Sequence, residues 1–119
     1  MAKKVLIAED YEDVRRMMKI MLELYGYEAL EASDGYEAVE KVAKFKPDVV
    51  LMDISMPVLD GLNATRAIRQ FEEGSNIPIL AITAYGDFYE DKAIDAGCTA
   101  VIPKPLQFDE LQPLLEKYI

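Results

Sequence analysis

The sequence predicts a single doubly wound α/β domain spanning residues 1–119, built on a five-stranded parallel sheet. Two observations support this fold class. Short aliphatic runs alternate with longer segments of helical periodicity along the whole chain. No linker, repeat or low-complexity tract interrupts the alternation. Because crossovers between parallel strands are right-handed, helices are expected on both faces of the sheet.

The first two strand–helix units open the chain. A strand is expected at 5–8, and the helix that follows over 11–25 stops at Gly26. Its apolar residues recur at helical spacing and predict its inward face, formed by Val14, Met17, Met18, Met21, Leu22 and Tyr25. The segment 28–32 is a more polar strand, which favours an edge position, and 36–44 is a second helix.

The third and fourth units follow the same pattern. Pro47 blocks extension of the second helix into the strand at 49–52. A helix is predicted over 62–71, and the fourth unit combines a strand at 79–82 with a weaker helix at 87–96.

The last unit pairs a strand at 100–102 with a helix at 107–118. Pro113 falls inside this helix, where a missing N–H and a ring clash normally cost about 3 kcal/mol. The pattern leaves open whether Pro113 kinks the helix or follows its first turn.

A residue that phosphoryl chemistry can use follows four of the aliphatic runs. In chain order these residues are Glu9 with Asp10, then Asp53, Thr83 and Lys104. In a parallel sheet the carboxyl ends of the strands lie along one edge, where ligands bind. Three acids, a hydroxyl and an amine therefore converge. This set predicts a Mg²⁺ site with an anion-binding rim.

Several of these residues also have a simpler structural explanation. In isolation, Glu9 and Asp10 are typical of a solvated loop, and Asp10 with Asp13 would cap the first helix. Asp53 closes an apolar strand, and an ion pair with Lys104 would offset its burial. The combination favours a metal, because three carboxylates without a cation repel one another strongly.

Composition excludes several classes of function. The apolar share of 51% and charged share of 29% are those of a soluble globular protein. A net charge of −9 disfavours direct binding to nucleic acid. Cys98 is the only cysteine, which indicates a core residue in a reducing compartment rather than a disulfide. Neither a signal peptide nor a membrane span is predicted, so we expect a cytoplasmic protein without membrane contact.

With these motifs in this order, the chain resembles the receiver domains of two-component response regulators. The resemblance covers essentially the whole chain. It rests on Glu9-Asp10, Asp53, Met56-Pro57, Asp60-Gly61, Thr83-Ala84, Lys104-Pro105 and the helix entry at 32–38. It implies a flavodoxin-like (βα)5 fold with strand order 2-1-3-4-5.

The resemblance also implies a role for each site residue. Asp53 would accept a phosphoryl group, Thr83 would hydrogen-bond the phosphoryl oxygens, and Lys104 would pair with them. The implied Mg²⁺ ligands are Asp10, Asp53, the backbone carbonyl of Ser55 and, through water, Glu9. The peptide bond before Pro105 is expected to be cis.

The same resemblance defines the partners. The phosphoryl donor would be the histidine of a sensor kinase or phosphotransfer protein, because this chain contains no histidine. The output would be an altered interaction with an effector protein or domain. Apart from Mg²⁺-assisted self-phosphorylation and autodephosphorylation, no enzymatic activity is expected.

Three positions modify this expectation. Val101 stands where the family usually has Tyr or Phe, so a rotating ring cannot report the state of Thr83. Tyr85 and Ser55, each two residues after a site residue, flank the phosphoryl group and influence the access of water. Tyr85 is either a partial cover for the site or an exposed aromatic residue.

Three alternative functions fit the same fold. An aspartate-nucleophile, Mg²⁺-dependent phosphatase typically needs an acid where this chain has Ser55, and a cap domain. A flavodoxin-like electron carrier needs a Ser/Thr/Gly-rich phosphate loop, whereas residues 9–13 are acidic and would repel it. A receiver serving only as a docking module would not require the five site residues, all of which are present.

Overall fold

The computed structural model describes residues 2–119 and has one parallel sheet with strand order β2-β1-β3-β4-β5. The strands are β1 (Lys4–Ala8), β2 (Glu28–Ala32), β3 (Val49–Asp53), β4 (Ile79–Thr83) and β5 (Ala100–Pro103). The helices are α1 (Glu12–Leu24), α2 (Gly35–Phe45), α3 (Gly61–Arg69), α4 (Gly86–Ala96) and α5 (Phe108–Tyr118), with a 3-10 turn η1 (Glu72–Gly74). The predicted fold class and order of elements are confirmed.

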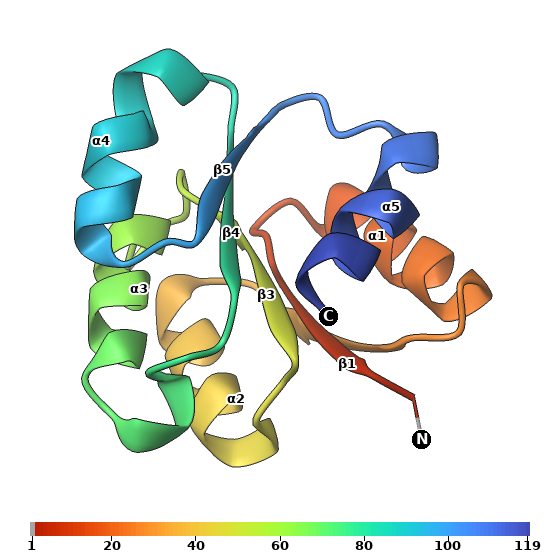
Figure 1. Ribbon diagram of the computed structural model, residues 1–119, viewed down its shortest axis with the longest axis horizontal. Coiled ribbons are helices and arrows are strands. Elements are labelled where there is room, and N and C mark those ends of the chain that lie inside the picture. The colour runs from red at the N-terminus through yellow and green to blue at the C-terminus, as the bar shows by residue number, and fades with distance from the viewer. Residues whose placement is uncertain (1) are drawn as a thin grey trace.

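The helices form two layers, one on each face of the sheet (Figure 1). α1 and α5 cover one face, whereas α2, α3 and α4 cover the other. Successive residues of β1 point to opposite faces, so Ile7 packs with the first layer and Leu6 with the second. Because both faces are covered, the central strands are almost entirely apolar. β2, which carries Glu28 and Glu31, lies at an edge as predicted.

The helix starts differ in how they are capped. Asp34 and Asp60 are the N-cap residues of α2 and α3, and each side chain accepts a backbone N–H of the first turn at 2.8 Å. The N-cap residue of α1 is Tyr11, which forms no side-chain cap. The explanation of Asp10 and Asp13 as caps is therefore wrong, because the helix starts between them.

The predicted inward face of α1 is only partly covered. Leu22 is fully buried, whereas Val14 and Met17 are 37% and 45% exposed. On the same side of the sheet, α5 continues through Pro113 to Tyr118. Within residues 2–119, no helix combines the length and apolarity that a membrane crossing requires.

Arg69, at the end of α3, joins three segments. Its Nε donates to the Gly97 carbonyl at the end of α4 at 2.9 Å, and its Nη1 donates to the carbonyls of Gly74 and Ile77 at 2.7 Å each. Gly97 has a φ of 110°, and a Cβ there would lie 2.8 Å from the Arg69 side chain. The Cys98 thiol is buried beside this junction, as its predicted core position requires.

We expect Arg69→Met to lower the free energy of unfolding by about 2 kcal/mol or more, because it leaves three carbonyls without a charged donor. Urea unfolding followed by circular dichroism measures this loss. Arg66→Met is the matched control, since Arg66 is exposed on the same helix and should change stability by less than about 0.5 kcal/mol. Equal losses in the two variants would contradict the role of Arg69.

Candidate functional site

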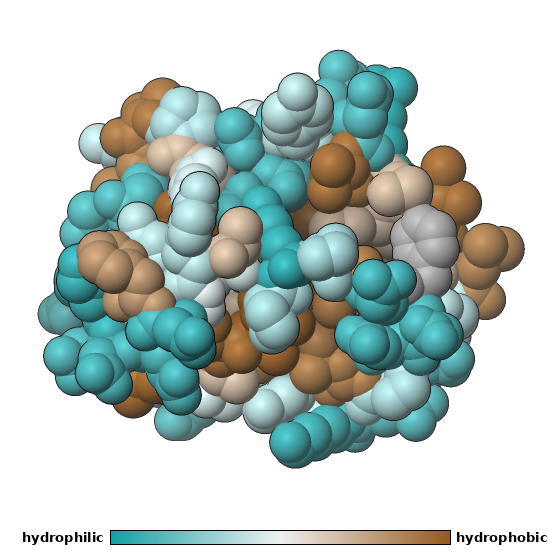
Figure 2. Space-filling view, turned by 90° about the horizontal axis from the view of Figure 1, so that it is seen from above, coloured by the Kyte–Doolittle hydropathy of each residue, from teal (hydrophilic) through white to brown (hydrophobic). Residues whose placement is uncertain are grey.

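The site residues lie at the carboxyl ends of β1, β3, β4 and β5, which meet at one edge of the sheet. Asp53 pairs with Ile82 in the strand register, and Thr83 pairs with Pro103. The Lys104 backbone N–H donates to the Thr83 carbonyl at 2.9 Å. Figure 2 looks onto this edge, where hydrophilic residues are interrupted by hydrophobic patches on the side of α1 and α5.

Three carboxylates form a cluster at this edge. Glu9, Asp10 and Asp53 each place one oxygen within 4.8 Å of the others. Glu9 and Asp53 are 6% and 4% exposed, whereas Asp10 is exposed. These residues fit a hard cation such as Mg²⁺, which takes a few carboxylate oxygens and keeps several waters on its open side.

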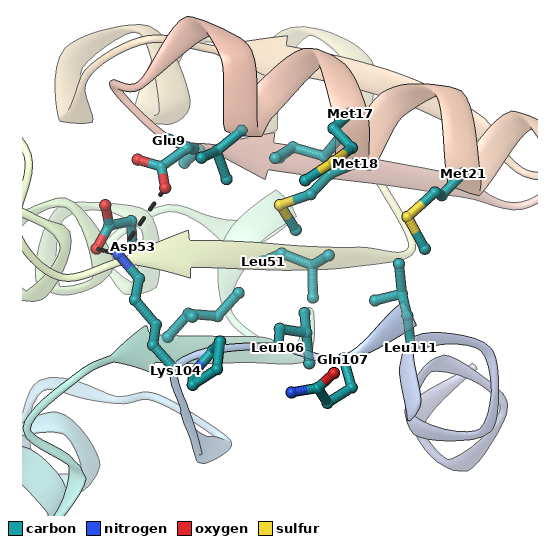
Figure 3. Close-up of a pocket in the computed structure, with 15 residues that line it drawn as sticks. Glu9, Met17, Met18, Met21, Leu51, Asp53, Lys104, Leu106, Gln107 and Leu111 are labelled. Atoms are coloured by element: carbon teal, nitrogen blue, oxygen red, sulfur yellow. Dashed lines mark hydrogen bonds and ion pairs between the residues drawn. The ribbon is translucent and has the colours of Figure 1, made fainter. Parts of the chain in front are cut away.

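The Lys104 ammonium lies against the two buried carboxylates (Figure 3). Its Nζ is 3.3 Å from Asp53 Oδ1 and 3.9 Å from Glu9 Oε1. The ion pair that offered a simpler explanation for Asp53 is therefore present. One ammonium does not balance three carboxylates, so the cluster can also accommodate a divalent cation.

Several causes together raise the pKa of Glu9 from its ordinary 4.5 to about 8. The largest is burial, followed by hydrogen bonding to Asp53 and Asp10 and by the charge of Asp53, whereas the hydrogen bond from the Tyr11 N–H, with a nitrogen-to-Oε2 distance of 3.3 Å, opposes the rise. Without a metal, the Glu9 carboxyl therefore retains a proton at neutral pH.

Arg15 of α1 holds the loop that carries the first two acids. Its Nη1 donates to the Glu9 carbonyl at 2.9 Å, and its Nε pairs with Glu31 of β2 at 3.2 Å. Sequence reasoning missed Arg15, because an arginine in a helix rich in charged residues gives no signal of what it contacts. Its role depends on the packing of α1 beside β2.

Backbone geometry positions Asp53. The Ser55 N–H donates to Asp53 Oδ1 at 3.1 Å, so the loop after β3 turns back to the carboxylate. A Cβ at Gly61 would lie 2.3 Å from the Asp53 carbonyl oxygen, so only glycine allows α3 to start this close to β3. The Asp60-Gly61 pair thus combines a helix cap with a close approach.

The remaining predicted positions lie around β4 and β5. Thr83 is buried, and its Oγ1 accepts the Tyr85 N–H at 3.0 Å. The Tyr85 side chain is 67% exposed. Val101 is half-buried and packs against the core on the α4 side. Pro105 is exposed and follows a cis peptide bond, as expected.

Comparisons with known proteins converge on one family. A family model for the response regulator receiver domain matches residues 5–116. The polar-differentiation response regulator DivK of Brucella ovis is 34% identical, with 100% of this chain and 98% of the relative covered. Solved structures are also similar over nearly the whole chain, and two examples follow.

The chemotaxis protein CheY4 of Vibrio cholerae has a TM-score of 0.94 and 30% identity, with 100% of both chains covered. The receiver domain of a sensor histidine kinase from Pseudomonas aeruginosa PAO1 has a TM-score of 0.92 and 34% identity, with 99% and 98% covered. That structure has a magnesium ion coordinated in its active site cleft.

For the metal-free protein, we expect the Glu9 contribution to stability to fall as pH rises from 4.5 to about 8. In this range the unfolded chain has released the Glu9 proton and the folded protein retains it, so raising the pH favours unfolding. Urea unfolding in the presence of a chelator, at constant ionic strength, measures this dependence.

Glu9→Gln should flatten the dependence, because the amide does not titrate. Glu90→Gln is the control, since Glu90 is exposed on α4. If Glu9→Gln and the wild type showed the same dependence on pH, the raised pKa of Glu9 would be wrong.

Proposed function

Because this chain belongs to the response regulator receiver family, we propose that it takes a phosphoryl group onto Asp53 from a histidine of another protein. The observation that carries this proposal is the position of the Asp53 carboxylate. It is buried at the end of β3, close to the carboxylates of Glu9 and Asp10 and in contact with the Lys104 ammonium.

In the proposed transfer, an Asp53 oxygen attacks phosphorus and the phosphorus–nitrogen bond to the donor histidine breaks. An aspartyl phosphate forms, and the imidazole leaves with the electron pair of that bond. This reaction requires in-line positioning and neutralisation of the equatorial oxygens more than proton transfer. Lys104, which already contacts Asp53, supplies one positive charge.

When bound, Mg²⁺ supplies the remaining positive charge. Its proposed ligands are Asp10, Asp53, the Ser55 carbonyl and, through water, Glu9. The support from this chain is the cluster of three carboxylates, whose mutual repulsion a divalent cation would relieve. Thr83 would donate its hydroxyl hydrogen to a phosphoryl oxygen, since its Oγ1 now serves as an acceptor for Tyr85.

The donor histidine would reach Asp53 beside α1. Exposed apolar side chains recur along α1 and at the residue before it; they are Tyr11, Val14, Met17, Ile20 and Leu24. Exposed apolar residues that gather on one segment are typical of a surface that packs against another protein. The donor would be a sensor kinase or a phosphotransfer protein, and the effector would bind elsewhere.

The alternatives differ in chemistry at the same edge. The family match removes the electron carrier, and Ser55 does not provide the second acid of an aspartate-nucleophile phosphatase. A docking-only receiver would have no need for the buried acid pair beside Lys104. Phosphorylation of the purified chain distinguishes the phosphoacceptor from the docking-only receiver.

We expect phosphoramidate with Mg²⁺ to place one phosphoryl group on the chain, at Asp53. Intact-mass spectrometry measures the added group, which should be stable to acid and labile to base. Asp53→Asn should remain unmodified because it lacks the nucleophilic carboxylate, and removal of Mg²⁺ should prevent the reaction in the wild type.

Asp95→Asn is the matched control, because Asp95 is an exposed aspartate on α4 and should leave phosphorylation unchanged. Asp10→Asn should raise the Mg²⁺ concentration required by about tenfold or more, since it removes a proposed ligand. A phosphoryl group retained by Asp53→Asn, or an unmodified wild type, would contradict the proposal.

We expect occupation of the site by beryllofluoride to change amide hydrogen exchange in residues 84–96 and to leave Val101 unaffected. Thr83 and the loop that follows would move, whereas Val101 is stiff and too small to fill the vacated space. The larger change should fall in the first half of α4, because Arg69 holds the Gly97 carbonyl at its other end. Changes in hydrogen exchange confined to β5 and α5 would contradict a response that passes through the loop after Thr83 and α4.

A further inference from the structure

A cavity of about 290 Å³ lies between α1, α5 and the sheet. In Figure 3, Met18 and Met21 of α1 point across it toward Leu106 and Leu111, with Leu51 of β3 at its floor. Its volume is near the lower limit for sites that hold small molecules. Protein interiors normally close such a space, because unfilled volume loses dispersion contacts.

One end of this cavity is polar. Glu9 and Asp53 line it, and the Lys104 stem runs along its wall to an ammonium that contacts both carboxylates. With Glu9 protonated, the carboxylates of Asp10 and Asp53 in the acidic cluster still outnumber the one ammonium in the lining, that of Lys104, so an additional cation would be attracted to this end. An additional anion would meet repulsion.

The other end suits a ring rather than a flexible chain. Met17, Met18 and Met21 all line the cavity. Thioethers are polarizable, adapt to irregular shapes and make favourable contacts with the edges of aromatic rings. Apart from the Gln107 amide, the wall between the two ends is apolar, so it contributes mainly apolar contact.

We propose that this cavity binds a small planar aromatic molecule bearing one positively charged amine. The rings would lie among the methionines, and the amine would lie toward Glu9 and Asp53. Such a molecule would also contact the Lys104 stem, so its binding would bias the contact between Lys104 and Asp53. The proposal does not depend on phosphorylation of the chain.

Three probes of nearly equal shape test the proposal: 1-naphthylmethylamine, 1-naphthalenemethanol and 1-naphthoate. Each is titrated to about 5 mM into metal-free protein with ¹³C-labelled methionine methyl groups, a range suited to weak ligands of this size. The amine should shift the Met18 and Met21 methyl signals with saturation and show ring-to-methyl NOEs. It should bind at least about tenfold more tightly than the carboxylate.

Variants separate the cavity from the surface of the same helix. Met18→Trp should fill the cavity and abolish the saturable shifts, whereas Ile20→Trp places the same ring on an exposed position of α1 and should leave binding intact. Asp53→Asn, which removes a charged carboxylate from the polar end, should reduce the preference for the amine. Thermal melting verifies that each variant is folded, and the wild-type NOEs provide a measurement that needs no variant.

Specific outcomes would overturn the proposal. The absence of saturable methyl shifts, or shifts without NOEs to the cavity methionines, would show that the cavity does not bind the probe. Equal binding of the three probes would show that the site does not prefer a positively charged ligand. Retention of full affinity in a folded Met18→Trp protein would place the ligand elsewhere.

Discussion

Repulsion among three carboxylates is the constraint on which this site depends. β1 and β3 are neighbours in register, so Glu9, Asp10 and Asp53 are held together whatever their charge. The fold offsets this repulsion only in part, through the ammonium of Lys104, which follows β5, and through protonation of Glu9. In the proposed phosphoryl transfer, the reactivity of Asp53 would therefore depend on the positive group that accompanies it, which is Lys104 alone or Lys104 together with Mg²⁺.

The two helical layers differ in how tightly their helices are joined near the site. On one face, Arg69 joins the ends of α3 and α4 to the segment before β4, which makes this layer continuous. The start of α4 lacks a side-chain cap and carries the exposed Tyr85 and Phe88. On the other face, α1 and α5 are separated by a cavity that opens beside Asp53. The site thus lies between a tightly joined layer and a more open one.

The strands and the residues at their ends were predictable, because aliphatic runs and polar breaks are local patterns that parallel topology brings to one edge. The contacts of Arg15 and Arg69 were not predictable, since Arg15 pairs with Glu31, 16 residues away, and Arg69 donates to the Gly97 carbonyl, 28 residues away. The inward face of α1 was overestimated at Met17, because periodicity identifies an apolar face and does not reveal how closely α5 approaches it. The incorrect caps for α1 arose because several neighbouring acids suit that position equally well.

The acidic character of β2 has a consequence for solubility at high concentration. An edge strand offers unpaired backbone groups to the sheet of another molecule. Here Glu28 is exposed on that edge, and a second copy that approached it would bring its own glutamates and a chain charge of −9. Strand-to-strand polymerisation would therefore have to bring like charges together, so the same acidity that suits this chain to a cation also protects it from amyloid-like growth.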